Sequence, residues 1–272
     1  MHKYLRLVYY KLRELFQWII NYYSDGHRLV VLQANPRAEV ETIWRMLTTP
    51  QKTVSTLRIG GNEDGGYCIP NSLSEIECFF SPGYGGIKTF EDELALKNIP
   101  SYICDGSYQS IDALLGMQYF VQKNIAAYDG RNCVSLQTLI EESKFSRSHN
   151  LGLQMDIEGD EYEILDSLET TILQKFQMLL IEFHDLELLV VSKRHCEKVT
   201  RVMKKLLETH DLVHVKANNA GGTISFKGSN LPNVIELSFL RKGERTLSEG
   251  EVHSHCNFLN DILKPKLDLP EL

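Results

Sequence analysis

Carboxylates crowd the end of one apolar stretch of the chain. Four of the six residues from Asp156 to Glu161 are acidic, and they lie at the end of an expected strand over residues 151–157. Such carboxylates repel one another, and proteins tolerate that cost where they bind a metal, accept a proton or hold substrate hydroxyls. Asp156 is expected to point out of the strand end and is the first catalytic candidate. Glu161 is expected to be solvated in the first turn of a helix, where the helix dipole favours it.

A second polar group ends the next apolar stretch, at Glu182-Phe-His184. Side chains alternate along a strand, so Glu182 and His184 share one face. Beside Asp156 on a neighbouring strand, His184 becomes the second catalytic candidate, for proton transfer. Alternatively, Asp156, Glu182 and His184 could hold a Mg²⁺ or Mn²⁺ ion that binds two vicinal hydroxyls. A histidine at this place can also be purely structural, and the sequence leaves these interpretations open.

A glycine-rich turn and a distant acid indicate a nucleoside cofactor. Gly83, Gly85 and Gly86 follow an expected strand, and glycine lets backbone approach a ligand closely. Asp105 lies 22 residues after Gly83, at the end of the following strand, where a carboxylate can accept hydrogen bonds from both ribose hydroxyls. The dinucleotide fingerprint would need a third glycine at Lys88, so the pattern favours a nucleoside without pyrophosphate over NAD.

Candidate substrate-binding residues lie in two further polar segments and in the acidic run. His214, Asn218 and Asn219 end another expected strand, and their side chains suit sugar hydroxyls, although an ordinary Asn/Gly turn explains the same residues. Asp64, in a turn between two short strands, and Glu158 complete the set.

Strands that alternate with helices must bring these strand ends together. This order predicts an α/β fold with a mainly parallel sheet, whose ligands bind at the carboxyl ends of the strands, and a last strand that pairs antiparallel at an edge. The expected strands are 57–60, 66–69, 76–80, 102–104, near 133–134, 151–157, 178–184, 211–216 and 234–240. The expected helices are 4–23, 37–48, 89–97, 110–123, 136–142, 160–168 and 187–209.

Over roughly residues 55–241, the chain resembles the FkbM-type S-adenosylmethionine-dependent methyltransferases. The segments that carry the resemblance are 58–67, 81–95, Asp105, 155–161, 181–184 and 231–237, of which Asp156-Ile-Glu-Gly-Asp-Glu161 is the most specific. The resemblance implies a Rossmann-like class I methyltransferase sheet with an antiparallel closing strand. It also implies methyl transfer from S-adenosylmethionine to an oxygen, commonly a sugar hydroxyl, in surface-polysaccharide or natural-product biosynthesis.

Carried over residue by residue, the resemblance gives each motif a role. The turn residues Gly83, Tyr84, Gly85 and Gly86 would line the cofactor, Glu91 would lie near it, Asp105 would hold the ribose and Asp156 would lie beside the transferred methyl group.

Two alternatives share the fold. A NAD-dependent sugar oxidoreductase lacks support because the third glycine and a Tyr-x-x-x-Lys pair near the turn are missing. A non-catalytic binding module is disfavoured by the presence of Asp105, Asp156 and His184.

Composition narrows the partners and the compartment. The 272 residues include 29 Lys and Arg against 36 Asp and Glu, a net charge of -7 that makes nucleic acid a poor partner. The 6 cysteines include no Cys-x-x-Cys, and Cys78 and Cys104 lie in apolar runs, so buried reduced thiols in the cytoplasm are expected. No stretch is long and apolar enough to predict a transmembrane helix.

The first 24 residues differ from the rest, with four basic residues, one acidic residue and seven aromatic residues. An amphipathic helix there could pack or dimerise, which would make the protein a homo-oligomer, or could lie on the inner face of a membrane as a peripheral contact. We therefore expect a helical extension over residues 1–50 and a methyltransferase domain over residues 51–272, acting on a small-molecule or glycan substrate.

Overall fold

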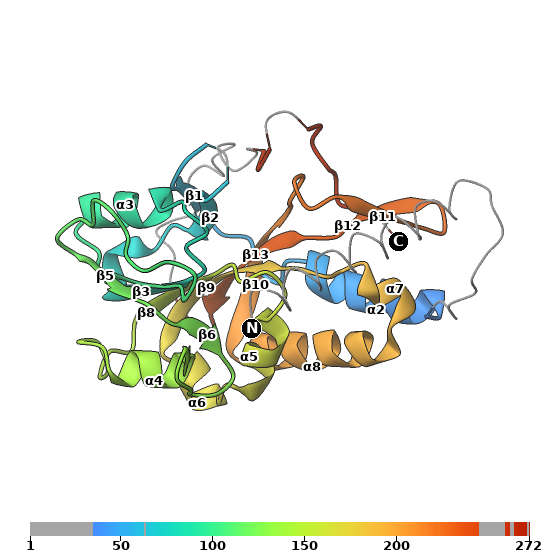
Figure 1. Cartoon of the computed structure of the whole chain (residues 1–272). Helices are drawn as coiled ribbons and strands as arrows, with labels where there is room; N and C mark the ends of the chain where they lie inside the picture. The colour runs from blue at the N-terminus through green and yellow to red at the C-terminus, as the bar shows by residue number, and fades with distance from the viewer. Residues whose placement is uncertain (1–34, 63, 245–258, 262–263, 271) are drawn as a thin grey trace.

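A mixed, mostly parallel sheet of seven strands forms the centre of the protein (Figure 1). The computed structural model describes residues 35–62, 64–244, 259–261, 264–270 and 272. The helix expected over 4–23 lies outside the described residues, so its membrane and dimerisation interpretations stay predictions. In sheet order, the strands are β10 (His210–Ala217), β13 (Ile235–Arg241), β9 (Phe176–Phe183), β8 (Leu151–Met155), β3 (Cys78–Pro82), β4 (Ser101–Cys104) and β5 (Gln118–Val121).

The strand pairing confirms the predicted α/β class. The neighbouring strands from β9 to β5 are parallel, and β13 is antiparallel to both β9 and β10. The expected edge position of β13 is wrong, because β10 is the edge strand and β13 lies inside the sheet. Its alternating polar residues misled the prediction: Glu236 and Ser238 are buried and hydrogen-bonded, so they do not mark a face open to water.

Helices cover one face of the sheet, and a smaller layer covers the other (Figure 1). The larger layer comprises α2 (Arg37–Thr48), α4 (Leu136–Glu141), α5 (Glu161–Ser167), α6 (Thr170–Leu173), α7 (Leu188–Val191) and α8 (Lys193–Thr209). The opposite layer comprises α3 (Thr89–Leu96) and the antiparallel pair β1 (Thr56–Ile59) and β2 (Tyr67–Pro70). Both faces of the central strands are therefore buried, which explains their near-continuous apolar sequences.

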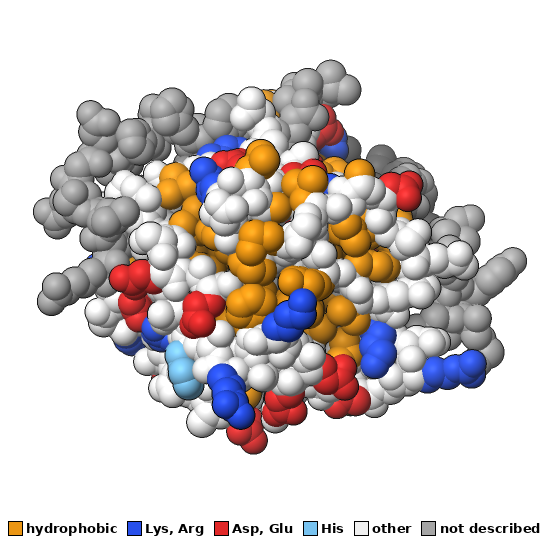
Figure 2. Space-filling model, turned by 90° about the vertical axis from the view of Figure 1, so that its left-hand side faces the viewer, with side chains coloured by type: hydrophobic (Ala, Val, Ile, Leu, Met, Phe, Trp, Pro, Cys, Tyr) orange, Lys and Arg blue, Asp and Glu red, His pale blue; other side chains and the backbone are white. Residues whose placement is uncertain are grey.

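Most expected elements lie within two residues of their predicted bounds, and two helices do not. The helix predicted over 110–123 is wrong. Ala113 adopts a positive φ of 53°, which no α-helix continues through, and β5 begins at Gln118. Leu114 and Leu115, which lie in this segment, are exposed. Figure 2 shows apolar side chains gathered on the face of the molecule that carries α3 and β5.

The long helix expected over 187–209 is divided at Ser192. This residue has an extended backbone, and its Oγ accepts a hydrogen bond from the backbone N–H of His195, which caps α8. Two short strand pairs have a less regular sequence signal: β6 (Asn124–Ala126) with β7 (Cys133–Ser135), and β11 (Thr223–Phe226) with β12 (Ser229–Pro232). Only the strand near 133–134 was predicted among these four.

The cysteines confirm the predicted thiols with one exception. Cys78 and Cys104 are buried and free, as expected from their apolar runs, and Cys133 and Cys196 are also free. Cys68 is disulfide-bonded, which the expectation of a reduced set did not foresee. In the part of the chain that the structure describes, no helix is long and apolar enough to cross a membrane.

Candidate active site

A cavity of about 340 Å³ opens at the carboxyl ends of three neighbouring strands. Its lining includes Gly83, Tyr84 and Gly85 after β3, Asp105 after β4, and Asp156 after β8. Parallel strands end at the same edge of a sheet, which is where open α/β sheets bind ligands. The volume is in the range of about 300 to 1,000 Å³ typical of small-molecule sites. The structure therefore brings together the predicted glycine turn, ribose acid and catalytic acid.

Close contact between the ends of two strands requires the first glycine of the turn. Gly83 has φ +96°, and a Cβ there would lie 1.6 Å from the backbone oxygen of Asp156, so only glycine lets the ends of β3 and β8 meet. Gly85 also has a positive φ, +56°, but a Cβ there would meet nothing within 4 Å. Gly86 follows in the same turn and is not part of the cavity lining. Close packing thus explains Gly83, and open space remains at Gly85 for a ligand.

Asp105 fixes the turn from the neighbouring strand end. Its Oδ2 accepts hydrogen bonds from the backbone N–H groups of Tyr84 (3.2 Å) and Gly85 (3.4 Å), and its Oδ1 accepts one from Ser107 (2.7 Å). The rings of Tyr84 and Tyr108, both in the cavity lining, meet edge to face with centroids 4.8 Å apart. The carboxylate and the two rings therefore form one wall of the cavity.

A line of hydrogen bonds crosses the floor of the cavity and connects two of the predicted acids. The hydroxyl of Ser81 bonds both Glu91 and Gln154. The amide of Gln154 donates to Tyr67 Oη (2.9 Å), which in turn lies 3.3 Å from Asp156 Oδ2. Glu91 and Asp156 are thereby linked through three side chains that sequence reasoning had not singled out. Tyr67 and Ser81 carried a signal, as the last residue of one motif of the resemblance and the first residue of the next.

Burial sets the charge of both acids. Burial raises the pKa of Glu91 to about 7, although its hydrogen bond with Ser81 acts in the opposite direction. Burial also raises the pKa of Asp156 to about 7, against the effect of the nearby His184 charge. Both carboxyl groups therefore change protonation near neutral pH, which is where a group that exchanges protons is most useful.

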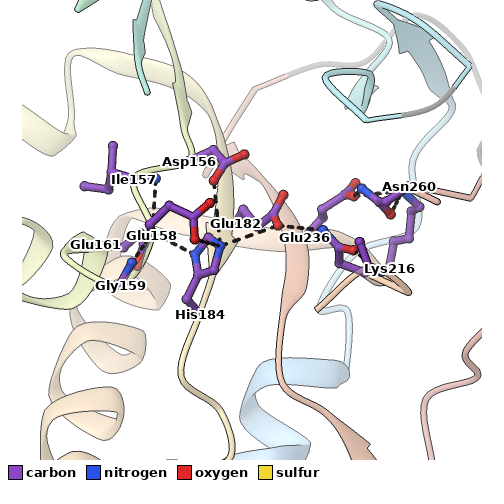
Figure 3. Close-up of polar contacts among 12 residues, drawn as sticks. Asp156, Ile157, Glu158, Gly159, Glu161, Glu182, His184, Lys216, Glu236 and Asn260 are labelled. Carbon is purple, nitrogen blue, oxygen red and sulfur yellow. Dashed lines mark hydrogen bonds and ion pairs between the residues drawn. The ribbon is translucent and has the colours of Figure 1, made fainter. Parts of the chain in front are cut away.

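The two predicted catalytic residues meet in a cluster of carboxylates (Figure 3). His184 Nε2 lies 3.8 Å from Asp156 Oδ1, 3.7 Å from Glu158 Oε2 and 3.7 Å from Glu182 Oε1. One ligand atom each from Asp156, Glu158 and His184 fits within a distance of 4.8 Å. The predicted metal set was Asp156, Glu182 and His184. Among the described residues, the compact set contains Glu158 instead of Glu182.

The expected solvation of Glu161 is wrong. Its side chain is 0% exposed, and its Oε1 lies 2.9 Å from His184 Nδ1. The same oxygen accepts hydrogen bonds from the backbone N–H groups of Ile157 (3.2 Å) and Gly159 (3.1 Å). Glu161 shares the inward face of α5 with the buried Ile164 and Leu165, whereas Glu163 in the same turn is exposed, so the helical spacing already placed Glu161 on the apolar face.

The carboxylates around His184 decide its charge. Burial alone lowers the pKa of a histidine, but the hydrogen bond with Glu161 and the charges of Glu161, Glu182 and Asp156 outweigh it and raise the pKa of His184 to about 10. Without another cation, the ring is therefore an imidazolium that partly neutralises the cluster.

A second row of polar residues lies behind the cluster, on β13, at the end of the edge strand β10 and in the C-terminal segment of the described chain (Figure 3). Asn218 Nδ2 donates to Glu182 Oε1 (2.6 Å). Glu236 lies directly opposite Glu182 across the β9–β13 pair. Lys216 Nζ lies 2.7 Å from Glu236 Oε1, and Asn260 Nδ2 donates to the same oxygen (2.6 Å). These contacts compensate two buried like charges that would otherwise repel one another.

The candidate substrate-binding residues are divided between two places. Asp64 and Glu158 line the main cavity, and Asn218 reaches its cluster through Glu182. His214 and Asn219 instead line a separate cavity of about 170 Å³ beside the edge strand β10. Asn219 Nδ2 also donates to the carbonyl oxygens of residues 261, 264 and 265, which makes it an anchor for the C-terminal segment.

The fold and site define an α/β protein with a ligand-sized cavity where its parallel strands end. The sequence model of the methyltransferase FkbM domain matches residues 17–207. This match covers more than half of the chain, and the protein belongs to the FkbM methyltransferase family. The predicted resemblance is thus confirmed, and the family supports methyl transfer. A comparison with curated proteins found no match.

Proposed function

We propose that this protein is an S-adenosylmethionine-dependent O-methyltransferase, built on a Rossmann-like class I sheet, that methylates a sugar hydroxyl. The acceptor would be a nucleotide sugar or a glycan end, in surface-polysaccharide or natural-product biosynthesis. One observation carries the proposal: a single cavity extends from the glycine turn and Asp105 to Asp156 and the carboxylate cluster. A nucleoside and a hydroxyl acceptor can therefore meet in one place.

The chemistry of the cavity walls fits the cofactor. Asp105 offers carboxylate oxygens to ribose hydroxyls, and the rings of Tyr84 and Tyr108 offer apolar contact to a nucleobase. Glu91, at the buried end of the same cavity, can pair with the ammonium group of a methionine moiety. When bound, S-adenosylmethionine would supply an electrophilic methyl group on a positively charged sulfur. The acidic lining complements that charge.

Asp156 would direct and deprotonate the acceptor. A sugar hydroxyl is a weak nucleophile, so the carboxylate of Asp156 would hold the hydroxyl in line with the methyl group and accept its proton. The new O–CH₃ bond forms as the S–CH₃ bond breaks, the bonding electrons remain on sulfur, and neutral S-adenosylhomocysteine leaves. Tyr67 holds Asp156 Oδ2 at 3.3 Å and fixes the direction of the carboxylate.

Exposed acceptors near Asp156 support a polyhydroxylated substrate. Glu158 is 58% exposed and has a positive φ of 62°, an uncommon conformation for a residue other than glycine. Together with Asp64 in the same lining, it offers carboxylate oxygens to neighbouring hydroxyls of a sugar ring. Such hydroxyl groups bind where several hydrogen-bond acceptors converge.

The test is a methyl-transfer assay with S-adenosylmethionine against a panel of nucleotide sugars and glycan ends. Asp156→Asn is expected to lower the rate by about 10²-fold to 10⁴-fold, because the general base is lost. The same variant should bind S-adenosylhomocysteine within a few-fold of the wild type. The matched control is Asp112→Asn, an exposed residue outside the cavity, which should keep the wild-type rate. An Asp156→Asn rate equal to that of the control would overturn the proposed role. Binding of NADH rather than S-adenosylhomocysteine would favour the oxidoreductase alternative.

A further inference from the structure

We propose that Asp156, Glu158 and His184 bind a divalent cation, of the Mg²⁺ or Mn²⁺ class, and that Glu161 is the residue that orients His184 toward it. The part of the cation in catalysis rests on the proposed methyl transfer, whereas its binding does not. This ligand set differs from the one expected from strand periodicity, because the structure brings Glu158 rather than Glu182 into the compact group.

The geometry of the three ligand atoms suits one ion. They come from two strand ends and lie within 4.8 Å of one another. Mg²⁺ binds oxygen ligands at about 2.0 to 2.1 Å, so ligand atoms on opposite sides of one ion lie about 4.2 Å apart, which is close to this limit. Two carboxylates and one imidazole are donors that Mn²⁺ accepts, and carboxylates with water suit Mg²⁺. In the part of the chain that the structure describes, Asp156 and Glu158 form ion pairs with His184 alone.

Glu161 fixes which ring nitrogen faces the carboxylates. Its Oε1 lies 2.9 Å from His184 Nδ1 and is held by the backbone N–H groups of Ile157 and Gly159. Nε2 is thereby directed toward Asp156 and Glu158 (Figure 3). A carboxylate behind a histidine is the usual arrangement around metal-binding imidazoles, where it orients the ring and increases its basicity.

A buried carboxyl oxygen without a hydrogen-bond partner points to a ligand at the same place. Glu182 is 4% exposed, and among the described residues its Oε2 has no hydrogen-bond partner. Its Oε1 lies 3.7 Å from His184 Nε2, the nitrogen that also faces Asp156 and Glu158. A buried carboxyl oxygen that lacks a hydrogen-bond partner costs stability. A divalent cation in the cluster would lower that cost for Glu182 without direct coordination.

The two oxygens of Asp156 can then serve different purposes. Oδ1 lies on the His184 side, where the cation would bind, and Oδ2 lies on the Tyr67 side, 3.3 Å from its hydroxyl. The bound cation would polarise the acceptor hydroxyl and lower its pKa. Asp156 Oδ2 would remain available to that hydroxyl, so cation binding and proton acceptance do not compete for one atom.

The experiment is a Mn²⁺ titration of the chelator-treated full-length protein, with free Mn²⁺ followed by its electron paramagnetic resonance signal. The wild type is expected to bind one Mn²⁺ saturably. Glu158→Gln should weaken binding at least tenfold, and Glu161→Gln should weaken it by about 10-fold to 100-fold. Glu163→Gln, on the exposed side of α5, is the matched control and should bind like the wild type. Circular dichroism checks that each variant is folded; Glu158 is largely exposed, so its variant should fold normally.

The same samples separate this inference from the proposed function. S-adenosylhomocysteine binding is measured by calorimetry without metal and then with saturating Mn²⁺. If S-adenosylhomocysteine binds and the wild type shows no saturable Mn²⁺ site, the cation proposal is overturned and the methyltransferase proposal stands. If Mn²⁺ binds as predicted and S-adenosylhomocysteine does not bind, the proposed function fails and the cation site stands. Equal Mn²⁺ affinity of Glu158→Gln and Glu163→Gln overturns the ligand set.

Discussion

Replacing Glu91 by glutamine should make the protein more stable at neutral pH. Glu91 is 5% exposed, and burial raises the pKa of its carboxyl group from 4.5 to about 7. One pKa unit corresponds to about 1.4 kcal/mol, so this shift is worth on the order of 3 kcal/mol. Between about pH 4.5 and pH 7 the unfolded chain has lost the Glu91 proton and the folded chain has kept it. The free energy of unfolding therefore falls as the pH rises through this window and stays level above it.

Glu91→Gln removes that loss because the amide has no proton to release. Urea unfolding at pH 4.5 and pH 7.5 should show that the variant gains about 3 kcal/mol relative to the wild type between the two pH values. Glu142→Gln, an exposed carboxylate on the surface, should keep the wild-type pH dependence. The variant should also bind S-adenosylhomocysteine more weakly, since an amide cannot form an ion pair with the ammonium group. Parallel pH curves for the wild type and Glu91→Gln would refute the reasoning.

Two further substitutions test the framework of the site by urea or thermal unfolding. Gly83→Ala should lower the free energy of unfolding by about 3 kcal/mol or more, because its Cβ would overlap the backbone of Asp156 at positive φ. Gly85→Ala should lower it by only about 1 to 2 kcal/mol, because its Cβ would meet nothing within 4 Å. Equal losses of stability in the two variants would contradict this explanation. Lys216→Met should lower the free energy of unfolding by about 3 kcal/mol, because it removes the cation beside buried Glu236. The double variant Lys216→Met with Glu236→Leu should regain most of that stability. A double variant no more stable than Lys216→Met would show that the ion pair is not the cause.

The positions of the strand-end carboxylates could be predicted because two simple features of α/β proteins determine them. An apolar run followed by polar residues marks the end of a buried strand, and parallel strands end at one edge of the sheet. Asp105 and Asp156 could be placed in one cavity on this basis, and Asp156 could be placed beside His184. Neither inference needed the order of the strands, so the wrong edge position of the last strand did not affect the prediction of the site.

The errors concern side chains whose neighbours are distant in sequence. Glu161 has the residue type of a solvated first-turn acid, and the position of His184, 23 residues later, shows which partner it has in the interior. The polar residues of β13 alternate as on an exposed face, but Lys216 from another strand forms an ion pair with Glu236 and Asn260 donates a hydrogen bond to it. Such compensation depends on tertiary contacts that neither residue type nor periodicity records.

Backbone conformation caused the remaining failure. The segment 110–123 has apolar residues at helical spacing, and a single positive φ at Ala113 prevents a continuous helix. Ala113 is itself neither glycine nor proline, but Gly116 lies in the same segment and was a signal against a continuous helix. The hydrogen-bonded line through Ser81, Gln154 and Tyr67 was also beyond sequence reasoning, because its members come from three strands.

Methyl transfer in this protein requires above all that the cavity binds the methyl donor. Calorimetric titration of the full-length protein with S-adenosylhomocysteine measures this, with Asp105→Asn as the test variant and Asp112→Asn as the exposed control. We expect saturable binding by the wild type and the control, and binding at least about tenfold weaker for Asp105→Asn, a loss of roughly 1.4 kcal/mol. Absence of binding by the wild type, or equal affinity of the two variants, would contradict the account.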